Sequence, residues 1–169
     1  EFVFALENIG LSTQEMKKRI AELVHYFSAQ SLLEQKPSLM SGGQKQTVNL
    51  LSALLLKPKL LLLDEPTAQL DPIAAKKFVM MLKQLNEETG MTIIMVEHQT
   101  EQLFEVADKM VLLERGEVLH AGSPQQFARQ LLQTPYEIFV PETVRYLYEQ
   151  QLLRGDVIPF NLKESKQLL

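Results

Sequence analysis

Two short, nearly continuous apolar runs, separated by a helical segment, constrain the fold of this chain more than any other feature. The first run is Leu60–Leu63 and the second is Met91–Val96, and acidic residues follow each of them. Runs of this kind are typical of strands buried on both faces of a parallel sheet. The segment between them begins at Asp71-Pro72, a favourable N-cap followed by proline at the first helical position. The pattern predicts an α/β fold with parallel strands.

Amphipathic helices and a hairpin are predicted on either side of these strands. Ser12–Glu15 has the S-x-x-E form of a capping box, and apolar residues recur behind it at helical spacing. A second helix begins at Ser41 and ends at Lys57-Pro58, and we expect it to be buried because its apolar residues occur on nearly all sides. Arg115-Gly116 predicts a tight turn between two short strands. Further helices are predicted at Ser123-Pro124, from Pro141 to about Arg154, and at Asn161.

Composition and charge exclude several classes of function. The net charge is −4, the acidic excess lies in residues 59–122, and no basic stripe is apparent, so nucleic acid is not an expected partner. An acidic centre is better suited to holding a divalent cation. The chain has no cysteine, which excludes disulfides and thiolate metal sites. The longest apolar run, residues 50–56, is too short to span a membrane, and no export leader is visible, so the cytosol is the expected compartment.

The segment Ser41-Gly42-Gly43-Gln44 has two interpretations. It can be an S-x-x-Q capping box and nothing more. However, glycine in a helix costs roughly 1 kcal/mol relative to alanine, and a chain accepts that cost where something must approach the backbone closely. A helix N-terminus with unobstructed N–H groups is a natural phosphate site. The two glycines therefore also indicate a candidate anion site.

Polar residues follow both predicted strands at their carboxyl ends, which is where ligands bind in open α/β sheets. Asp64 and Glu65 follow the first strand, where one carboxylate can reach a Mg²⁺ ion while the other faces a water molecule. The same pair can also be a plain acidic turn. His98 follows the second strand, although a lone histidine is more often an ordinary surface residue. Asp71 is adequately explained as an N-cap.

Taken in order, these motifs resemble the second half of an ATP-binding-cassette (ABC) ATPase over about residues 30–130. The resemblance implies the C-terminal part of a RecA-like P-loop NTPase core with its helical subdomain, containing parallel strands and a terminal hairpin. It implies three regions. Residues 1–58 correspond to the helical subdomain with the signature motif, residues 59–132 to the second half of the ATPase core, and residues 133–169 to a family-specific helical tail or connector.

The resemblance also implies a role for each candidate residue. Residues 41–44 match the signature motif, which contacts the γ-phosphate of ATP held by the opposite subunit. Asp64 matches the Walker B aspartate that orients Mg²⁺, and Glu65 matches the catalytic glutamate that polarises the attacking water. Asp71 belongs to the loop that bridges the two subunits. His98 matches the switch histidine that senses the γ-phosphate.

The first residues narrow the resemblance further. Residues 2–11 are similar to the segment that follows the glutamine loop in the ATPases of energy-coupling-factor importers, which take up cobalt, nickel or water-soluble vitamins. This similarity implies ATP and Mg²⁺ as cofactors, and a second ABC ATPase subunit and transmembrane transporter subunits as partners. It also implies a peripheral position on the inner, cytoplasmic face of the cell membrane.

The chain departs from the family pattern in several places. Thr47 stands where arginine is common, Gln69 where glycine or serine is usual, and Glu97 where serine or threonine is frequent. The sequence contains no G-x-x-x-x-G-K-[ST] segment, so we expect a fragment that cannot hydrolyse ATP alone and that self-associates through an uncovered sheet. Two alternatives stay open: a non-transport ABC ATPase, such as a translation or repair factor, and a non-catalytic interaction module that kept the fold.

Overall fold

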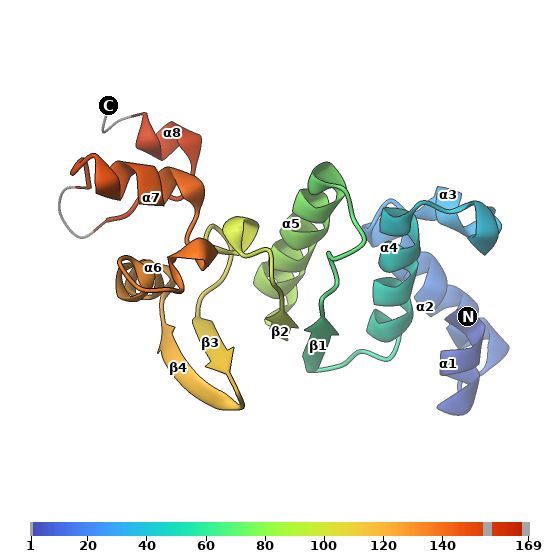
Figure 1. Cartoon of the computed structure of the whole chain (residues 1–169). Coiled ribbons are helices and arrows are strands. Elements are labelled where there is room, and N and C mark those ends of the chain that lie inside the picture. The colour runs from blue at the N-terminus through green and yellow to red at the C-terminus, as the bar shows by residue number, and fades with distance from the viewer. Residues whose placement is uncertain (1, 154–156, 167–169) are drawn as a thin grey trace. The chain divides into compact units, whose positions relative to one another are not determined.

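A computed structural model describes residues 2–153 and 157–166, and the chain divides into two compact units, residues 1–96 and 97–169 (Figure 1). The boundary follows Val96, the last residue of the second predicted strand. The division into three regions, with boundaries after residues 58 and 132, stays a prediction.

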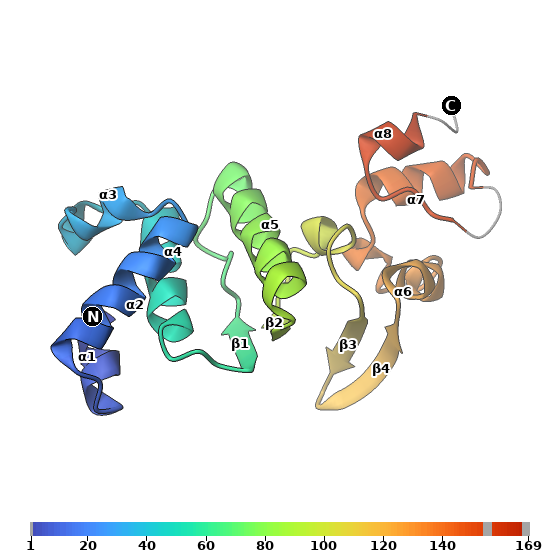
Figure 2. The same ribbon diagram turned by 180° about the vertical axis from the view of Figure 1, so that it is seen from behind.

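Helices form the first part of the first unit. They are α1 (Phe2–Asn8), α2 (Thr13–Tyr26), α3 (Gln30–Leu33) and α4 (Gly42–Leu54), with a 3₁₀ turn at Pro37–Leu39. The capping boxes predicted for α2 and α4 are both present. Leu6 of α1, Met16 of α2 and Leu55 at the end of α4 are buried against one another, and these three helices lie together in Figure 2. Helix α1 was not predicted, and it contributes a single buried residue, Leu6.

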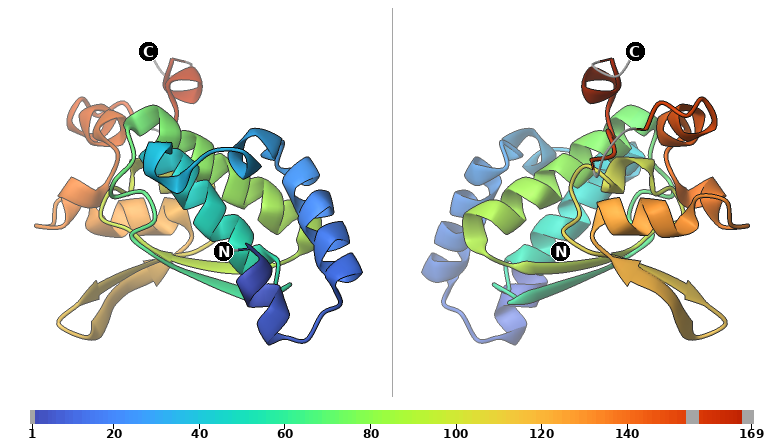
Figure 3. Two further views of the ribbon diagram at one scale, coloured as in Figure 1. Left: turned by 90° about the vertical axis from the view of Figure 1, so that its right-hand side faces the viewer. Right: turned by 90° about the vertical axis from the view of Figure 1, so that its left-hand side faces the viewer.

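The strands of the first unit form the predicted parallel pair. β1 (Leu60–Asp64) and β2 (Thr92–Val96) lie with Leu60 opposite Thr92 and Asp64 opposite Val96. Helix α5 (Pro72–Thr89) connects them, and Gly90 ends it in the left-handed conformation that favours glycine. Helices α4 and α5 lie on the same side of the strand pair (Figure 3). Between helices and strands the buried core consists of Leu50, Leu54, Leu61, Phe78, Leu82 and Leu85.

The expectation that both faces of these strands are buried is wrong for the described part of this unit. Side chains alternate between the two faces of a strand, and the helices cover only the face that carries Leu61. On the other face Leu62 is 67% exposed, Ile94 52% and Val96 50%. The expected uncovered sheet face is therefore confirmed. Helix α4 is likewise not buried all round, because Val48 is only half-buried.

The second unit contains the predicted hairpin. β3 (Met110–Glu114) and β4 (Glu117–Gly122) pair in antiparallel fashion. Arg115 and Gly116 both have positive φ, 50° and 83°, as a two-residue turn of the primed type requires. Helices α6 (Pro124–Leu131), α7 (Glu142–Glu149) and α8 (Leu162–Ser165) follow, with 3₁₀ turns at Glu101–Leu103 and Glu137–Phe139.

The predicted end of α7 near Arg154 is wrong. The helix ends at Glu149, and Gln151 beyond it adopts a positive φ of 56°, which is incompatible with a continuing helix. Arg154 and Gly155, the predicted stop, lie outside the described residues. The predicted cap of α8 is confirmed, because Asn161 Oδ1 accepts a hydrogen bond from the Glu164 amide at 2.9 Å.

Among the described residues, no helix combines the length and the apolar character that a membrane span requires.

Candidate functional site

The N-terminus of α4 is closed by a reciprocal capping box. Ser41 Oγ accepts a hydrogen bond from the Gln44 amide at 3.3 Å, and Gln44 Oε1 accepts one from the Ser41 amide at 2.8 Å. The capping interpretation of this motif is therefore correct. It does not account for the glycines, because a capping box places no demand on the two residues inside it.

The two glycines lie against a segment of the same chain. A Cβ atom on Gly42 would lie 3.0 Å from the carbonyl oxygen of Gln69, and one on Gly43 would lie 3.4 Å from Cβ of Ala74. The two glycines predict a close approach to the backbone here, for which a phosphate was the candidate. In the structure, residues 69–74 make that approach. The helix that carries the signature motif and the segment that leads into α5 are thus packed together.

Two positions at which the chain departs from the family pattern both touch this glycine pair. The carbonyl oxygen of Gln69 faces the position that a Cβ atom on Gly42 would occupy. Thr47 Oγ1 donates a hydrogen bond to the Gly43 carbonyl at 2.9 Å, one turn back along α4. Such bonds to the preceding turn tend to bend a helix slightly. Thr47 acts here through its side chain, whereas Gln69 acts through a backbone carbonyl that any residue would supply.

Asp64 and Glu65 occupy the carboxyl end of β1. Asp64 is the last strand residue and is exposed. Glu65 is exposed and has a φ of 44°, in the left-handed region that residues other than glycine rarely adopt. Its amide donates to the Val96 carbonyl at 2.9 Å, and this bond to β2 holds the unusual conformation. Backbone strain of this kind is concentrated at functional positions.

Local hydrogen bonds order the segment between β1 and α5. Asp71 Oδ1 accepts from the amides of Ile73 at 3.0 Å and Ala74 at 2.9 Å, so Asp71 is the predicted N-cap of α5. The Leu70 amide donates to the carbonyl of Thr67 at 3.0 Å, and the Thr67 side chain is buried. These bonds fix the path by which residues 69–71 reach the glycines of α4.

The structure brings some of the predicted residues of the first unit together. Residues 41–44 and the segment ending at Asp71 are in direct contact, and Asp64 and Glu65 begin the connection that leads to that segment. His98 follows β2 by two residues, is exposed and belongs to the second unit.

The carboxyl end of β1 suits a magnesium site whose ligands come partly from the protein and partly from a nucleotide. Within residues 2–153 and 157–166, no three or more His, Cys, Asp or Glu side chains gather as a metal centre. Mg²⁺ is commonly bound through one or two carboxylates together with phosphate oxygens and water. The exposed carboxylate of Asp64 can supply that protein share, and the remaining ligands would come from a nucleotide and from water.

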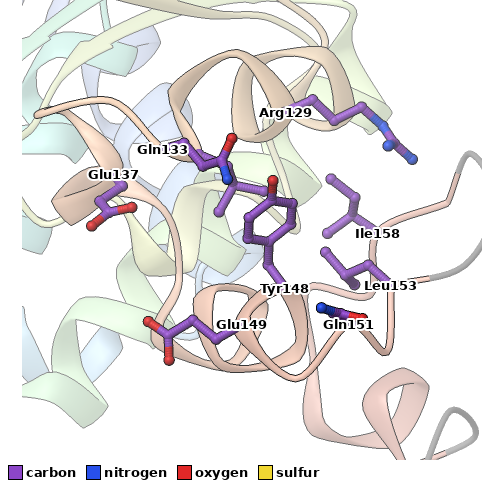
Figure 4. A pocket seen from close by; sticks show the side chains of 9 residues that line it. Arg129, Gln133, Glu137, Tyr148, Glu149, Gln151, Leu153 and Ile158 are labelled. Carbon is purple, nitrogen blue, oxygen red and sulfur yellow. The ribbon is translucent and has the colours of Figure 1, made fainter.

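A hollow of about 710 Å³ lies in the second unit, and no sequence motif pointed to it. Figure 4 shows the Tyr148 ring near its centre, with Arg129 and Ile158 on one side and Gln133 on the other. Its charged lining residues are of both signs, since Arg129 is accompanied by Glu137 and Glu149.

Comparisons with known proteins identify the family. The family model for ABC transporters matches residues 2–68. The solved structure of cbiO1 from Clostridium perfringens, described as part of the ABC transporter complex cbiONQ, matches 88% of this chain and 59% of its own with a TM-score of 0.70 at 26% identity. The chain matches part of the ATP-binding domain of ABC transporters. Its α/β class and its relation to the P-loop NTPase fold are thereby confirmed.

Sequence relatives among ABC proteins extend over most or all of the chain. A putative ABC transporter ATP-binding protein of Bacillus thuringiensis subsp. konkukian is 42% identical over 170 residues, which cover 100% of this chain and 30% of the relative. The energy-coupling factor transporter ATP-binding protein EcfA1 of Clostridium novyi is 34% identical over 152 residues, 89% of this chain and 54% of the relative. The chain therefore spans between about a third and about half of these curated relatives.

Proposed function

We propose that this chain is the later half of an ABC ATP-binding subunit that couples ATP hydrolysis to solute import, of the energy-coupling-factor type. One arrangement carries the proposal. The glycine-containing N-terminus of α4 packs on residues 69–74, where the connection from β1 leads into α5. The same connection begins at the end of β1, where two carboxylates are exposed. In a nucleotide-sandwich site, such a helix N-terminus would serve the nucleotide of the opposing subunit, and the carboxylates would serve the nucleotide of their own subunit.

Each residue has a defined task in this proposal. The backbone of Gly42 and Gly43, beside Ser41 and Gln44, faces the γ-phosphate of ATP on an opposing subunit, where a helix N-terminus favours an anion. Asp64 orients Mg²⁺, and Glu65 polarises the attacking water as general base. Asp71 lies at the contact between subunits, and His98 senses the γ-phosphate. The magnesium ion would neutralise phosphate charge when bound.

Partners and location follow from the same proposal. A second ABC ATPase subunit completes the nucleotide site, and transmembrane transporter subunits connect hydrolysis to movement of the solute. The assembly would place the chain at the inner face of the cell membrane. The relatives named for an energy-coupling factor transporter and for a cbiONQ complex support importers of this type.

The 169 residues alone are proposed to be inactive. They contain no P-loop motif, whose backbone cradle and lysine offset the charge of a triphosphate. The two carboxylates Asp64 and Glu65 repel ATP when no such counter-charge is present. Calorimetric titration with Mg-ATP tests this proposal, and saturable micromolar binding by the isolated chain would contradict it.

The isolated chain is also proposed to self-associate through the uncovered face of β1 and β2, because exposed apolar strands pair readily with other chains. Light scattering should report oligomers that dissociate in the double variant Leu62→Thr, Ile94→Thr. Ile73→Thr is the matched control, since Ile73 is 70% exposed but lies on α5. A monodisperse monomer of the unchanged chain, or equal dissociation by the control, would contradict this interface.

The proposed activity is tested in a longer polypeptide in which this chain follows a P-loop segment. Glu65→Gln should retain ATP binding and lose turnover by about 10²–10⁴-fold, the usual contribution of a general base. Glu87→Gln, an exposed carboxylate on α5, is the control and should hydrolyse ATP at the unchanged rate. Unchanged turnover in Glu65→Gln would exclude this residue as the base, and the absence of any ATPase activity would favour a non-catalytic interaction module.

A further inference from the structure

A second cavity lies in the first unit, at the amino-terminal end of the strands, and the candidate nucleotide residues lie at their carboxyl end. It has a volume of about 650 Å³ and is lined by residues of α2, of the connection from α4 to β1 and of the C-terminal end of α5. Lys59 and Met91, which line it, immediately precede β1 and β2, whereas Asp64 is the last residue of β1 and Glu65 follows it. Its volume is within the range of small-molecule sites, roughly 300–1,000 Å³.

The interior of this cavity is apolar. Three of its leucines belong to the buried core and form a fixed floor: Leu54, Leu55 and Leu85. Leu23 of α2, Phe27 directly after α2 and Met91 before β2 are half-buried and complete the apolar lining. A ligand that enters would therefore bury an aliphatic or aromatic body against residues that are already ordered by core packing.

Three basic side chains line the cavity beside this apolar surface: Arg19, Lys57 and Lys59. Arg19 Nη1 donates a hydrogen bond to the Leu55 carbonyl at 3.2 Å, which holds the guanidinium at the cavity. A guanidinium has five N–H donors in a fixed fork, so one bond leaves others for an anion. Both lysines are exposed. Their ammonium groups are therefore in the solvent from which an anionic ligand would enter the cavity.

The only acid among the residues that line this cavity, Glu22, lies 3.9 Å from Lys18 in an exposed i, i+4 pair. The local charge of the lining is therefore positive in a chain whose net charge is −4. Tyr26 also lines the cavity, and its hydroxyl donates a hydrogen bond to Glu88 of α5. This bond joins α2 to α5, and the Glu88 carboxylate is its acceptor.

We propose that this cavity binds a small amphipathic anion, namely a molecule with an aliphatic or aromatic body and a single carboxylate. The body occupies the apolar interior, and the carboxylate is held by Arg19, Lys57 and Lys59. Because the ligand would contact α2 and α5 together, it strengthens the attachment of the helical part to the strands. The site requires no nucleotide and is independent of the proposed ATPase activity.

Decanoate is a suitable probe, and decanol is its neutral counterpart with the same tail. Calorimetric titration of the 169-residue chain without nucleotide should give saturable binding of decanoate and at least about tenfold weaker binding of decanol. The double variant Lys57→Gln, Lys59→Gln should weaken decanoate binding about tenfold. Lys36→Gln, an exposed lysine outside the cavity, should leave it unchanged.

Amide chemical-shift mapping locates the bound probe and separates it from the uncovered sheet face. Decanoate should shift the signals of Leu23, Phe27 and Met91. Shifts confined to Leu62 and Ile94 would overturn the proposal, because they would show a non-specific apolar contact. Equal affinity for decanoate and decanol, or no binding of decanoate at all, would also overturn it.

Discussion

Replacing each signature glycine by alanine tests whether the close approach of residues 69–74 explains the glycine pair. Gly42 and Gly43 are the first two residues of α4, so alanine brings a similar gain in helix propensity at both. Their tertiary neighbours differ. The new Cβ meets the Gln69 backbone carbonyl at 3.0 Å at position 42, but only the Ala74 methyl at 3.4 Å at position 43.

The magnitude follows from this difference in contacts. Alanine in place of helical glycine gains up to about 1 kcal/mol in the free energy of unfolding, and less within the first turn. At position 42 the backbone of residues 69–70 must move, and forced overpacking typically costs about 1–3 kcal/mol. We expect Gly43→Ala to be neutral or stabilising by up to about 1 kcal/mol. We expect Gly42→Ala to be less stable than Gly43→Ala by about 1–3 kcal/mol.

Urea unfolding followed by far-ultraviolet circular dichroism measures the comparison. The slope of unfolding free energy against urea should be the same in both variants, so that the midpoints report stability alone. The Leu62→Thr, Ile94→Thr background keeps the chain dispersed during the measurement. Equal midpoints, or a higher midpoint for Gly42→Ala, would refute the reasoning that contact with Gln69 requires glycine.

Three further predictions concern the glycines, the strained glutamate and a tyrosine. In the polypeptide with a P-loop, Gly43→Asp should reduce hydrolysis because a carboxylate opposes the γ-phosphate. ATP affinity measured on single subunits should stay unchanged, and a matching loss would place the glycines at the nucleotide of their own subunit. Glu65→Asn should raise the unfolding free energy by about 0.5–1 kcal/mol, because asparagine tolerates positive φ. The same variant should lose hydrolysis. An unchanged urea midpoint would argue against stored strain at position 65. The hydrogen bond to Glu88 raises the pKa of Tyr26 to about 12. The contribution of this bond to folding stability is therefore present below pH 10 and is lost as the pH rises towards 12. Glu88→Gln should return the Tyr26 pKa towards 10 in an ultraviolet titration, and an unaltered titration would contradict the bond.

The order of local motifs predicted the secondary structure around the candidate residues well. Caps, strands and turns are encoded by neighbouring residues, which is why the box at Ser41 and the N-cap at Asp71 were predicted correctly. The partner of the glycines was not predictable in this way. A sequence shows that Gly42 leaves room, but the occupant, the carbonyl of Gln69, comes from a distant position in the chain. The positive φ of Glu65 was missed for a similar reason, because its bond to Val96 depends on strand pairing.

The uncovered face of β1 and β2 shows what an apolar pattern alone can establish. A continuous run such as Leu60–Leu63 predicts that both faces of a strand prefer burial, but it does not say what covers each face. Within the first unit, α4 and α5 cover the face of Leu61, and the face of Leu62 and Ile94 stays exposed. If only one face were ever covered, polar residues at alternate positions would serve equally well there. The leucine at position 62 and the isoleucine at 94 therefore indicate a covering partner for the second face, and the proposed function assigns that position to the P-loop half of the ATP-binding domain.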